Sequence, residues 1–187
     1  MKNQILVILL ATFSIGVFAQ TQKINTKKSS IEWTGKKIGG QHQGFIQITK
    51  GSLSLKNDQL IAGEFTIDMN SITNTDLENE SYNQKLIGHL KSDDFFGVSN
   101  FPTASFKLVK STKFVEGKAT VTGEITIKGI TQSINFNVER KGNTYSGKIE
   151  VDRSKFNVKY GSTSFFDSLG DKAIDDIFIL DVKLIIE

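Results

Sequence analysis

Most of this chain alternates between apolar and polar residues with a period of two, and this pattern constrains the fold more than any other feature. Side chains of a β-strand point to opposite faces of the sheet in turn, so each alternating segment offers one face to a core and one to water. Near the end of the chain, the apolar row comprises Phe178, Leu180, Val182, Leu184 and Ile186. Threonine, valine, isoleucine and phenylalanine, which suit a half-buried pleated surface, recur in these segments. The pattern predicts an all-β domain.

The alternating segments are short, and turn-forming residues such as 141–143 separate them. The expected strands start near Ile31, Phe45, Ser52, Ile61, Thr103, Thr120, Ile134, Tyr145 and Ile177. An antiparallel meander of this kind can hide its apolar face in a two-layer sandwich or by closing into a barrel. Glycines inside the strands, at Gly63, Gly123 and Gly147, fit either the sharp coiling of a barrel and the close approach of a bulky group, or bulges in a sandwich. The pattern alone leaves both architectures open.

Residues 74–101 interrupt the strands and have the features of a helical insertion. Thr75–Glu78 matches a capping box, in which the threonine hydroxyl and the glutamate carboxylate satisfy free amides at a helix start. Apolar residues then recur at four-residue spacing and form the narrow stripe Tyr82, Leu86 and Leu90. We therefore expect a short helix that begins near Thr75.

Two adjacent aspartates and two adjacent phenylalanines follow this stripe. Ser92–Asp94 can cap a further turn that carries Phe95 and Phe96. Neighbouring residues on a helix point about 100° apart, so the two carboxylates are not placed to share a proton. Pro102 keeps the residue before it out of helical geometry and starts the next strand. The aspartates are better explained as caps than as an acid–base pair.

Residues 1–19 resemble a secretory signal peptide. Lys2 gives a positive start, Ile5–Val17 is almost wholly apolar, and Ala19 is a small residue before a cut at Gln20. The apolar run is shorter than a membrane span requires, although an uncleaved membrane anchor is the alternative interpretation. We expect cleavage after Ala19 and a single domain over residues 20–187, which is long enough to bury its own core.

The composition disfavours several classes of function. There is no cysteine, so disulfides and thiolate metal sites are excluded. The net charge is only +3 and the lysines are scattered, whereas nucleic-acid binding needs clustered basic residues. His42 and His89 are the only histidines, and they lack a tight metal-ligand spacing. The chain has no G-x-S-x-G elbow and no glycine-rich phosphate loop. Nothing in these residues requires a catalytic site or a cofactor.

Phenylalanine is the most informative residue type, with 14 copies against 1 tryptophan and 3 tyrosines. These rings either fill a core or line a cavity for a ligand that has no polar groups along its length. An eight-stranded barrel is near the size at which the interior is either filled by side chains or holds one small ligand. Composition does not separate the two alternatives.

Several motifs together resemble the YceI-like family of exported lipid-binding (polyisoprenoid-binding) proteins. The most specific are the sequences HLKSDDFF at 89–96, FPTASF at 101–106 and VTGEITIKGIT at 121–131. Further agreement in order and spacing comes from 33–36, 42–44, 67–72, 153–158 and 175–176. The resemblance therefore covers essentially the whole domain. One position departs from the pattern, because Gly97 stands where the family usually has an aspartate.

The resemblance implies an extended, antiparallel, eight-stranded, lipocalin-like barrel with a short helical insertion. It implies a periplasmic binding protein, not an enzyme, whose elongated cavity holds a polyisoprenoid, an isoprenoid quinone or another long-chain amphiphile for carriage, storage or scavenging. An apolar pocket with few hydrogen-bond donors suits such a ligand. The alternatives are an enzyme that modifies the lipid, with His89 and Asp94 as acid–base groups, and an interaction protein with a filled core.

The candidate ligand-binding residues fall into three groups. The expected cavity wall comprises Trp33, Phe45, Phe65, Phe106, Phe136 and Phe156. The expected lid or plug comprises Leu90, Phe95 and Phe96. The candidates for polar contacts with a head group are His42, His89, Asp94 and Arg153. Anchoring of the helical insertion is the competing role for these four residues.

The expected partner is a long-chain lipid and not a nucleic acid. A transient contact with a membrane or a membrane protein is a further expectation. The identity of the lipid and the oligomeric state, for which a dimer is one option, stay open.

Overall fold

The computed structural model of this chain describes residues 20–187. The expected signal peptide and its cleavage after Ala19 lie outside this range. Within it, no helix is long and apolar enough to cross a membrane.

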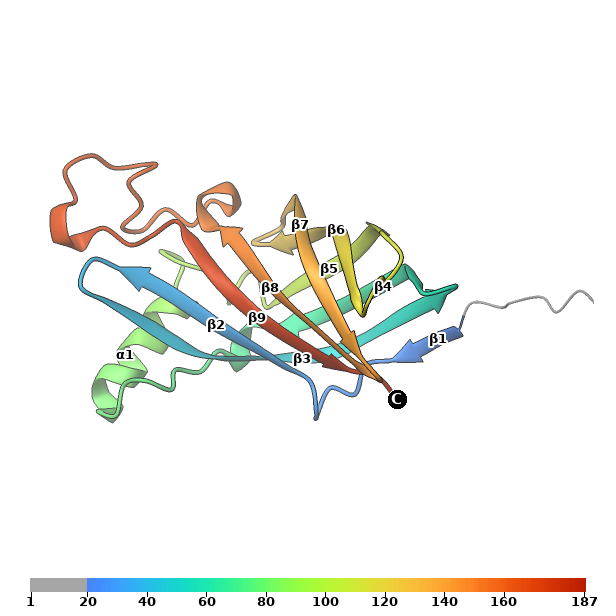
Figure 1. The fold of residues 1–187 in the computed structure, drawn as a ribbon. Helices are drawn as coiled ribbons and strands as arrows, with labels where there is room; N and C mark the ends of the chain where they lie inside the picture. Colours follow the sequence, from blue (N-terminus) through green and yellow to red (C-terminus); the bar gives the residue numbers. More distant parts are fainter. Residues whose placement is uncertain (1–19) are drawn as a thin grey trace, which may run out of the picture.

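The described residues form nine antiparallel strands in one sheet (Figure 1). They are β1 (Gln20–Lys23), β2 (Ser30–Lys37), β3 (Gly40–Lys56), β4 (Gln59–Asp68), β5 (Thr103–Ser111), β6 (Lys118–Ile127), β7 (Ile130–Lys141), β8 (Thr144–Asp152) and β9 (Ile177–Ile185). Their spatial order is β1-β3-β2-β9-β8-β7-β6-β5-β4, and the last strand, β4, also pairs with β3. Strands β2 to β9 therefore close into an eight-stranded barrel, which confirms the barrel and excludes the sandwich.

The longest strand, β3, joins the barrel to the additional strand β1. The segments expected to start separately near Phe45 and Ser52 belong to this one strand. One edge of β3 pairs with β2 over 40–46 and with β1 over 52–55, while the other edge pairs with β4 over 47–56. A register shift between Ile48 and Lys50 marks a bulge, which lets the long strand bend around the barrel.

The helical insertion is present, but its start differs from the predicted one. Helix α1 runs from Glu80 to Lys91, and the side chain of Asn79 accepts a hydrogen bond from Tyr82 N. The prediction of a capping box at Thr75–Glu78 was wrong, because these residues precede the helix. Thr75 and Asp76 instead hydrogen-bond to Gln43 of β3. Tyr82 is exposed, so the predicted stripe is reduced to Leu86 and the buried Leu90. Pro102 precedes β5, as predicted.

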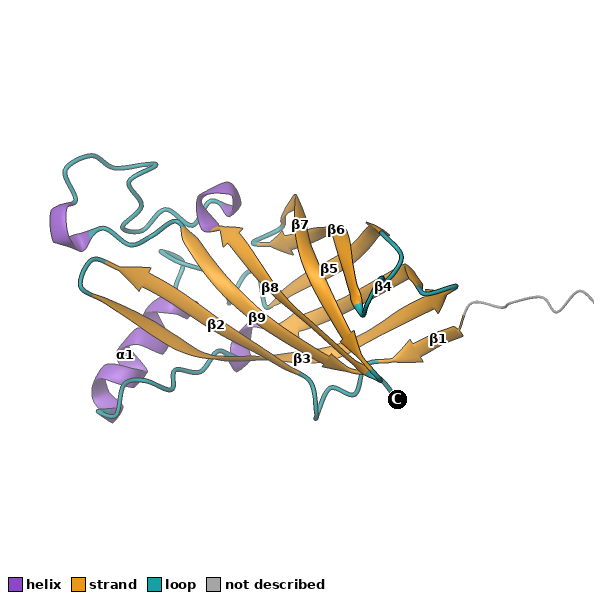
Figure 2. Ribbon diagram, in the orientation of Figure 1, coloured by secondary structure: helices purple, strands orange, loops and turns teal. Residues whose placement is uncertain are grey.

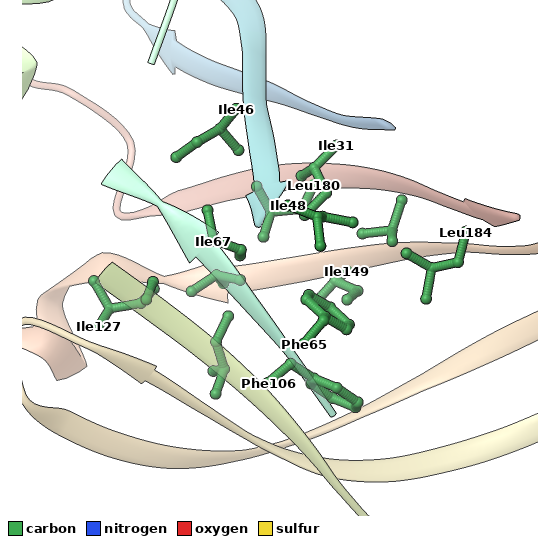
Figure 3. Close-up of a cluster of buried hydrophobic side chains, with 14 of the residues drawn as sticks. Ile31, Ile46, Ile48, Phe65, Ile67, Phe106, Ile127, Ile149, Leu180 and Leu184 are labelled. Carbon is green, nitrogen blue, oxygen red and sulfur yellow. The ribbon is translucent and has the colours of Figure 1, made fainter. Parts of the chain in front are cut away.

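Three short 3-10 helices complete the fold: η1 (Met69–Ser71), η2 (Arg153–Phe156) and η3 (Gly170–Lys172). Figure 2 shows α1, η2 and η3 toward one end of the barrel, at the left of the view. The buried side chains form one core inside the strands, and Figure 3 shows part of it. The strands thus enclose an apolar interior, and the helices and long loops gather around one end.

Candidate binding cavity

An apolar cavity of about 90 Å³ lies within the barrel. The strands contribute inward-facing side chains, which are Ile46, Ile67, Ala104, Ile125, Ile127 and Leu180. The helical insertion contributes Leu90, Phe95 and Phe96, and the segment that includes η1 contributes Met69 and Ile72. Because these side chains present only hydrocarbon to the cavity, the cavity suits an apolar ligand.

The rim of the cavity lies where β2 and β9 stop pairing. Their register ends at Thr34 and Ile179. The lining residues that are not fully buried are Trp33, Gly35, Phe96, Ile174, Asp175 and Phe178. Most of them come from the end of β2 or from the segment that leads into β9. This part of the barrel is therefore the entrance to the cavity.

The aromatic plug at the end of the insertion is fixed by packing and by backbone hydrogen bonds. The Phe95 ring packs edge-on against Phe96, with ring centroids 5.0 Å apart, and against His89 at 5.7 Å. Lys128 Nζ donates to the carbonyl oxygen of Phe95 at 2.7 Å. Gly97 has φ +58°, a left-handed conformation that glycine adopts at no steric cost. This conformation explains why glycine fits this position.

Arg153 is a buried cation that is held by backbone carbonyls. Its side chain lies at the start of η2, and the residue is 1% exposed. Four N–H groups donate to backbone carbonyls of Val158, Tyr160, Ile174 and Asp175 at 2.8–3.0 Å. Nη2 also lies 3.3 Å from Oδ1 of Asp176, which is an ion-pair distance without hydrogen-bond alignment. Although Arg153 lines the cavity, its donors are committed, which favours the anchoring role over a head-group contact.

The charges around Arg153 compensate one another. Burial lowers the pKa of Arg153, while the neighbouring carboxylate of Asp176 opposes this shift. For Asp176, partial burial alone would raise the pKa, but hydrogen bonds from Ser162 and Ser164 and the charge of Arg153 outweigh it, so the pKa lies below its usual value. Both groups therefore stay ionised as a buried pair.

His42 lies in a second anchor, outside the cavity. Its Nδ1 is 2.7 Å from Oδ2 of Asp76, and Oδ1 of the same carboxylate accepts from Gln43 N at 2.8 Å. Burial alone would raise the pKa of Asp76, but the hydrogen bonds from Gln43, His42 and Asn74 outweigh it and the pKa is lowered. His42 thus ties the segment before α1 to β3.

The same segment covers the edge of β3 that β4 leaves unpaired. Thr73 N donates to Phe45 O, Thr75 N donates to Gln43 O, and the indole N–H of Trp33 donates to Thr73 O at 3.0 Å. The fit requires glycine at position 44, because a Cβ there would lie 1.9 Å from Thr73 O. Residues 73–76 therefore seal the barrel wall next to the cavity.

The structure brings together five of the thirteen predicted ligand-binding residues at this cavity. They are Trp33, Leu90, Phe95, Phe96 and Arg153. Three more lie in the barrel interior but line a separate cavity of about 40 Å³, namely Phe65, Phe106 and Phe136. Phe156 is buried and lines neither cavity.

The other predicted residues lie elsewhere. Phe45 is 43% exposed on the outer face of β3, between the buried Gly44 and Ile46, so its assignment to the wall is corrected. Asp94 is exposed and lines a surface groove with Lys128 and Lys159, which places it outside the cavity.

His89 packs against the aromatic rings of Phe95 and Tyr160. Its ring centroid is 4.3 Å from that of Tyr160 in an edge-on arrangement. His89 does not line the cavity, and neither does Asp94, its expected partner in an acid–base pair. Within residues 20–187, no group of three or more histidine and acidic side chains gathers as a metal site would require.

Several lining residues are absent from the sequence-based set. Ile125, Ile127, Phe178 and Leu180 belong to the alternating apolar rows, so periodicity marked them as inward-facing without singling them out. Met69 and Ile72 lie in or beside the short helix η1 and have no such pattern. Only the three-dimensional course of the chain places them at the cavity.

Comparisons with known proteins agree with the fold. The family profile described as the YceI-like domain matches residues 22–185. The UPF0312 protein plu2095 of Photorhabdus laumondii is 32% identical over 88 residues, which cover 41% of this chain and 45% of that protein. The match thus spans less than half of that relative.

Two solved structures have the same architecture. BcnA of Burkholderia cenocepacia superposes with a TM-score of 0.68 at 23% identity, covering 86% of this chain and 98% of that chain. A polyisoprenoid binding domain from Saccharophagus degradans, implicated in plant cell wall breakdown, superposes with a TM-score of 0.58 at 12% identity, covering 89% and 97% of the two chains. At these identities the likeness establishes a shared fold.

Proposed function

Because this chain belongs to the YceI-like family, we propose that it is an exported protein that binds an apolar lipid, such as a polyisoprenoid or an isoprenoid quinone. The observation that carries the proposal is the cavity inside the closed barrel, whose presented surface is hydrocarbon. The ligand class of the structurally similar polyisoprenoid binding domain supports it. Carriage, storage or scavenging of the lipid is the role that such a cavity serves.

The size of the cavity limits how much of a ligand it buries. An apolar cavity of about 150 Å³ holds one benzene ring, so a cavity of about 90 Å³ has room for roughly three to four carbon atoms. Each buried methylene contributes about 0.8 kcal/mol, which gives roughly 2–3 kcal/mol before the cost of ordering the ligand. Burial of the end of a tail therefore supplies part of the affinity for the lipid.

The side chains around the cavity favour binding over catalysis. The two residues that could form an acid–base pair, His89 and Asp94, do not line it. The buried guanidinium of Arg153 directs its donors to backbone carbonyls and to Asp176. A substrate in the cavity would meet hydrocarbon side chains and no free proton donor from these candidates, which supports a binding protein that is not an enzyme.

The periplasm is the proposed location, with residues 1–19 removed after Ala19. A transient membrane contact fits the exposed apolar side chains near the rim. Ile38 follows Lys37, which bridges Ile174 at the rim, and Phe165 and Phe166 are exposed on the segment between η2 and η3. A lipid could then pass between the membrane and the cavity over a short path.

Partial filling of the cavity tests the proposed site. Ala104 is buried and lines the cavity, so Ala104→Leu should occupy space that the ligand needs and weaken prenyl-lipid binding on the order of tenfold. Ala62→Leu is the matched control, because Ala62 is exposed on β4. Both dissociation constants would be measured by titrating a prenyl alcohol. Equal affinities for the two variants would argue against this cavity as the site.

A further inference from the structure

The interior of the barrel is divided into two cavities. Neighbouring inward-facing residues of one strand line different cavities: on β4, Ile67 lines the cavity of about 90 Å³ and Phe65 the cavity of about 40 Å³. On β5, Ala104 and Phe106 are divided in the same way. Figure 3 shows Phe65 and Phe106 side by side, with Ile127 toward one side of them and Leu184 toward the other. The two phenylalanines therefore lie at the boundary between the cavities.

The rings at this boundary are packed tightly enough to block a ligand chain. The rings of Phe65 and Phe106 are stacked with centroids 5.1 Å apart, and Phe136 packs edge-on against Phe106 at 5.7 Å. Both Phe65 and Phe106 are buried. Stacked and edge-on aromatic pairs at these distances are in favourable contact, so no gap the width of a hydrocarbon chain separates them.

Two glycines make room for these rings inside the barrel. A Cβ on Gly123 of β6 would lie 2.2 Å from Cε2 of Phe106, which is far inside van der Waals contact. A Cβ on Gly147 of β8 would lie 3.3 Å from Cδ2 of Phe136. The neighbouring strands β6 and β8 thus lack side chains at the positions where the rings lie, so the boundary is built into the packing of the five strands β4 to β8.

We propose that Phe65 and Phe106 form the floor of the ligand cavity and limit the length of chain that the protein can bury. This inference rests on the proposed function and adds a ligand class to it: amphiphiles whose buried apolar part is short. A cavity with room for roughly three to four carbon atoms holds most of one five-carbon isoprene unit. Further units would stay outside the rim and add little affinity.

A chain-length series of prenyl alcohols, from one to four isoprene units, tests the floor. For the wild-type domain, the affinity should level off at about one unit. In Phe106→Ala the two cavities join and the space of the ring is added, so the second unit should increase the affinity by about tenfold or more, because its hydrocarbon becomes buried. Phe45→Ala, which removes the same side chain from the outer face of β3, should keep the wild-type series.

The outcomes separate the two proposals. The proposed floor would be contradicted if the affinity of the wild type kept rising through four units. It would also be contradicted if the affinity of Phe106→Ala levelled off at the same length as that of the wild type. Both results would leave the proposal of lipid binding intact. A wild-type domain that binds none of the alcohols would overturn the proposed function and, with it, the floor. If Phe106→Ala does not fold, Phe106→Leu also shortens the side chain, and its series should likewise extend beyond that of the wild type.

Discussion

At the scale of single residues, Arg153 has the most consequential position. One guanidinium satisfies carbonyls at residues 158, 160, 174 and 175, so it gathers the long segment between η2 and β9 against the barrel. Ile174 and Asp175 in that segment belong to the cavity rim. Its guanidinium carbon also lies 5.5 Å from the centre of the Phe95 ring in the plug. Arg153 thus positions both the rim and the plug without a free donor for a ligand.

Replacement by lysine should not rescue this role. Lysine has three donors on a single nitrogen, whereas the four carbonyls around Arg153 are arranged around a planar guanidinium group with three nitrogens. Arg153→Lys should therefore lower the free energy of unfolding by about 3 kcal/mol or more, as expected when a buried charge pair loses its geometry. The control is Arg140→Lys, because Arg140 pairs with the exposed Asp58 and its loss should cost less than about 1 kcal/mol. Urea unfolding of both variants measures the difference, and equal losses would contradict the anchoring role.

Two glycines should respond in opposite directions to alanine. Gly123→Ala would place a methyl group against the Phe106 ring and should destabilise the protein by about 1–3 kcal/mol. Gly88 lies in α1 with nothing within 4 Å of an added Cβ, so Gly88→Ala should stabilise by about 0.5–1 kcal/mol. Thermal unfolding of the two variants would show the opposite shifts. A neutral Gly123→Ala would mean that the Phe106 ring has room to move.

At the scale of elements, the segment 73–76 has a role equivalent to that of a strand. It hydrogen-bonds to residues 43 and 45 of β3 and receives the indole N–H of Trp33, although it has no regular strand geometry. Asp76 fixes its end through His42, Gln43 and Asn74. The helical insertion is therefore attached to the barrel by the hydrogen bonds of Asp76 on the outside and by the aromatic plug at the cavity.

The hydrogen bonds of Asp76 and the ion pair between Arg153 and Asp176 should make the free energy of unfolding depend on pH in the acidic range. The pKa values of Asp76 and Asp176 lie below the usual value of 3.8, so the unfolded chain takes up protons first as the pH falls. The stabilisation is complete above about pH 4 and is lost as the pH falls through the lower pKa values of the folded state. Urea midpoints should therefore be steady near neutral pH and fall in acid. In Asp76→Asn, the urea midpoint should fall less in acid than it does in the wild type. The same pH dependence in the variant and the wild type would contradict the assignment to Asp76.

The sequence predicted the elements whose residues repeat and missed those that depend on contacts between distant segments. The apolar row of β9 faces the barrel interior, as its alternation implied, and it lines both cavities. Phe45 was misassigned although its own row, with Gln47 and Thr49, is polar, because aromatic character outweighed periodicity in the prediction. Thr75 has a capping-box sequence, yet it donates its backbone N–H to Gln43 O because β3 offers an unpaired edge there.

At the scale of the whole molecule, closure of eight strands produces an apolar interior that opens at one end. The lining of hydrocarbon, the entrance where β2 and β9 stop pairing, and the phenylalanine floor together form the chamber that we propose for one short tail. The aromatic plug and the segment 73–76 close the remaining side.

The most direct test of this account is the native mass of the mature domain purified from membrane-rich cells. We expect a population with added mass that organic extraction removes and that a prenyl alcohol restores in a one-to-one complex. Ala104→Leu should carry less of the added mass than Ala62→Leu. A domain that shows only its own mass, and that takes up no prenyl alcohol after extraction, would contradict the claim that the barrel holds a lipid.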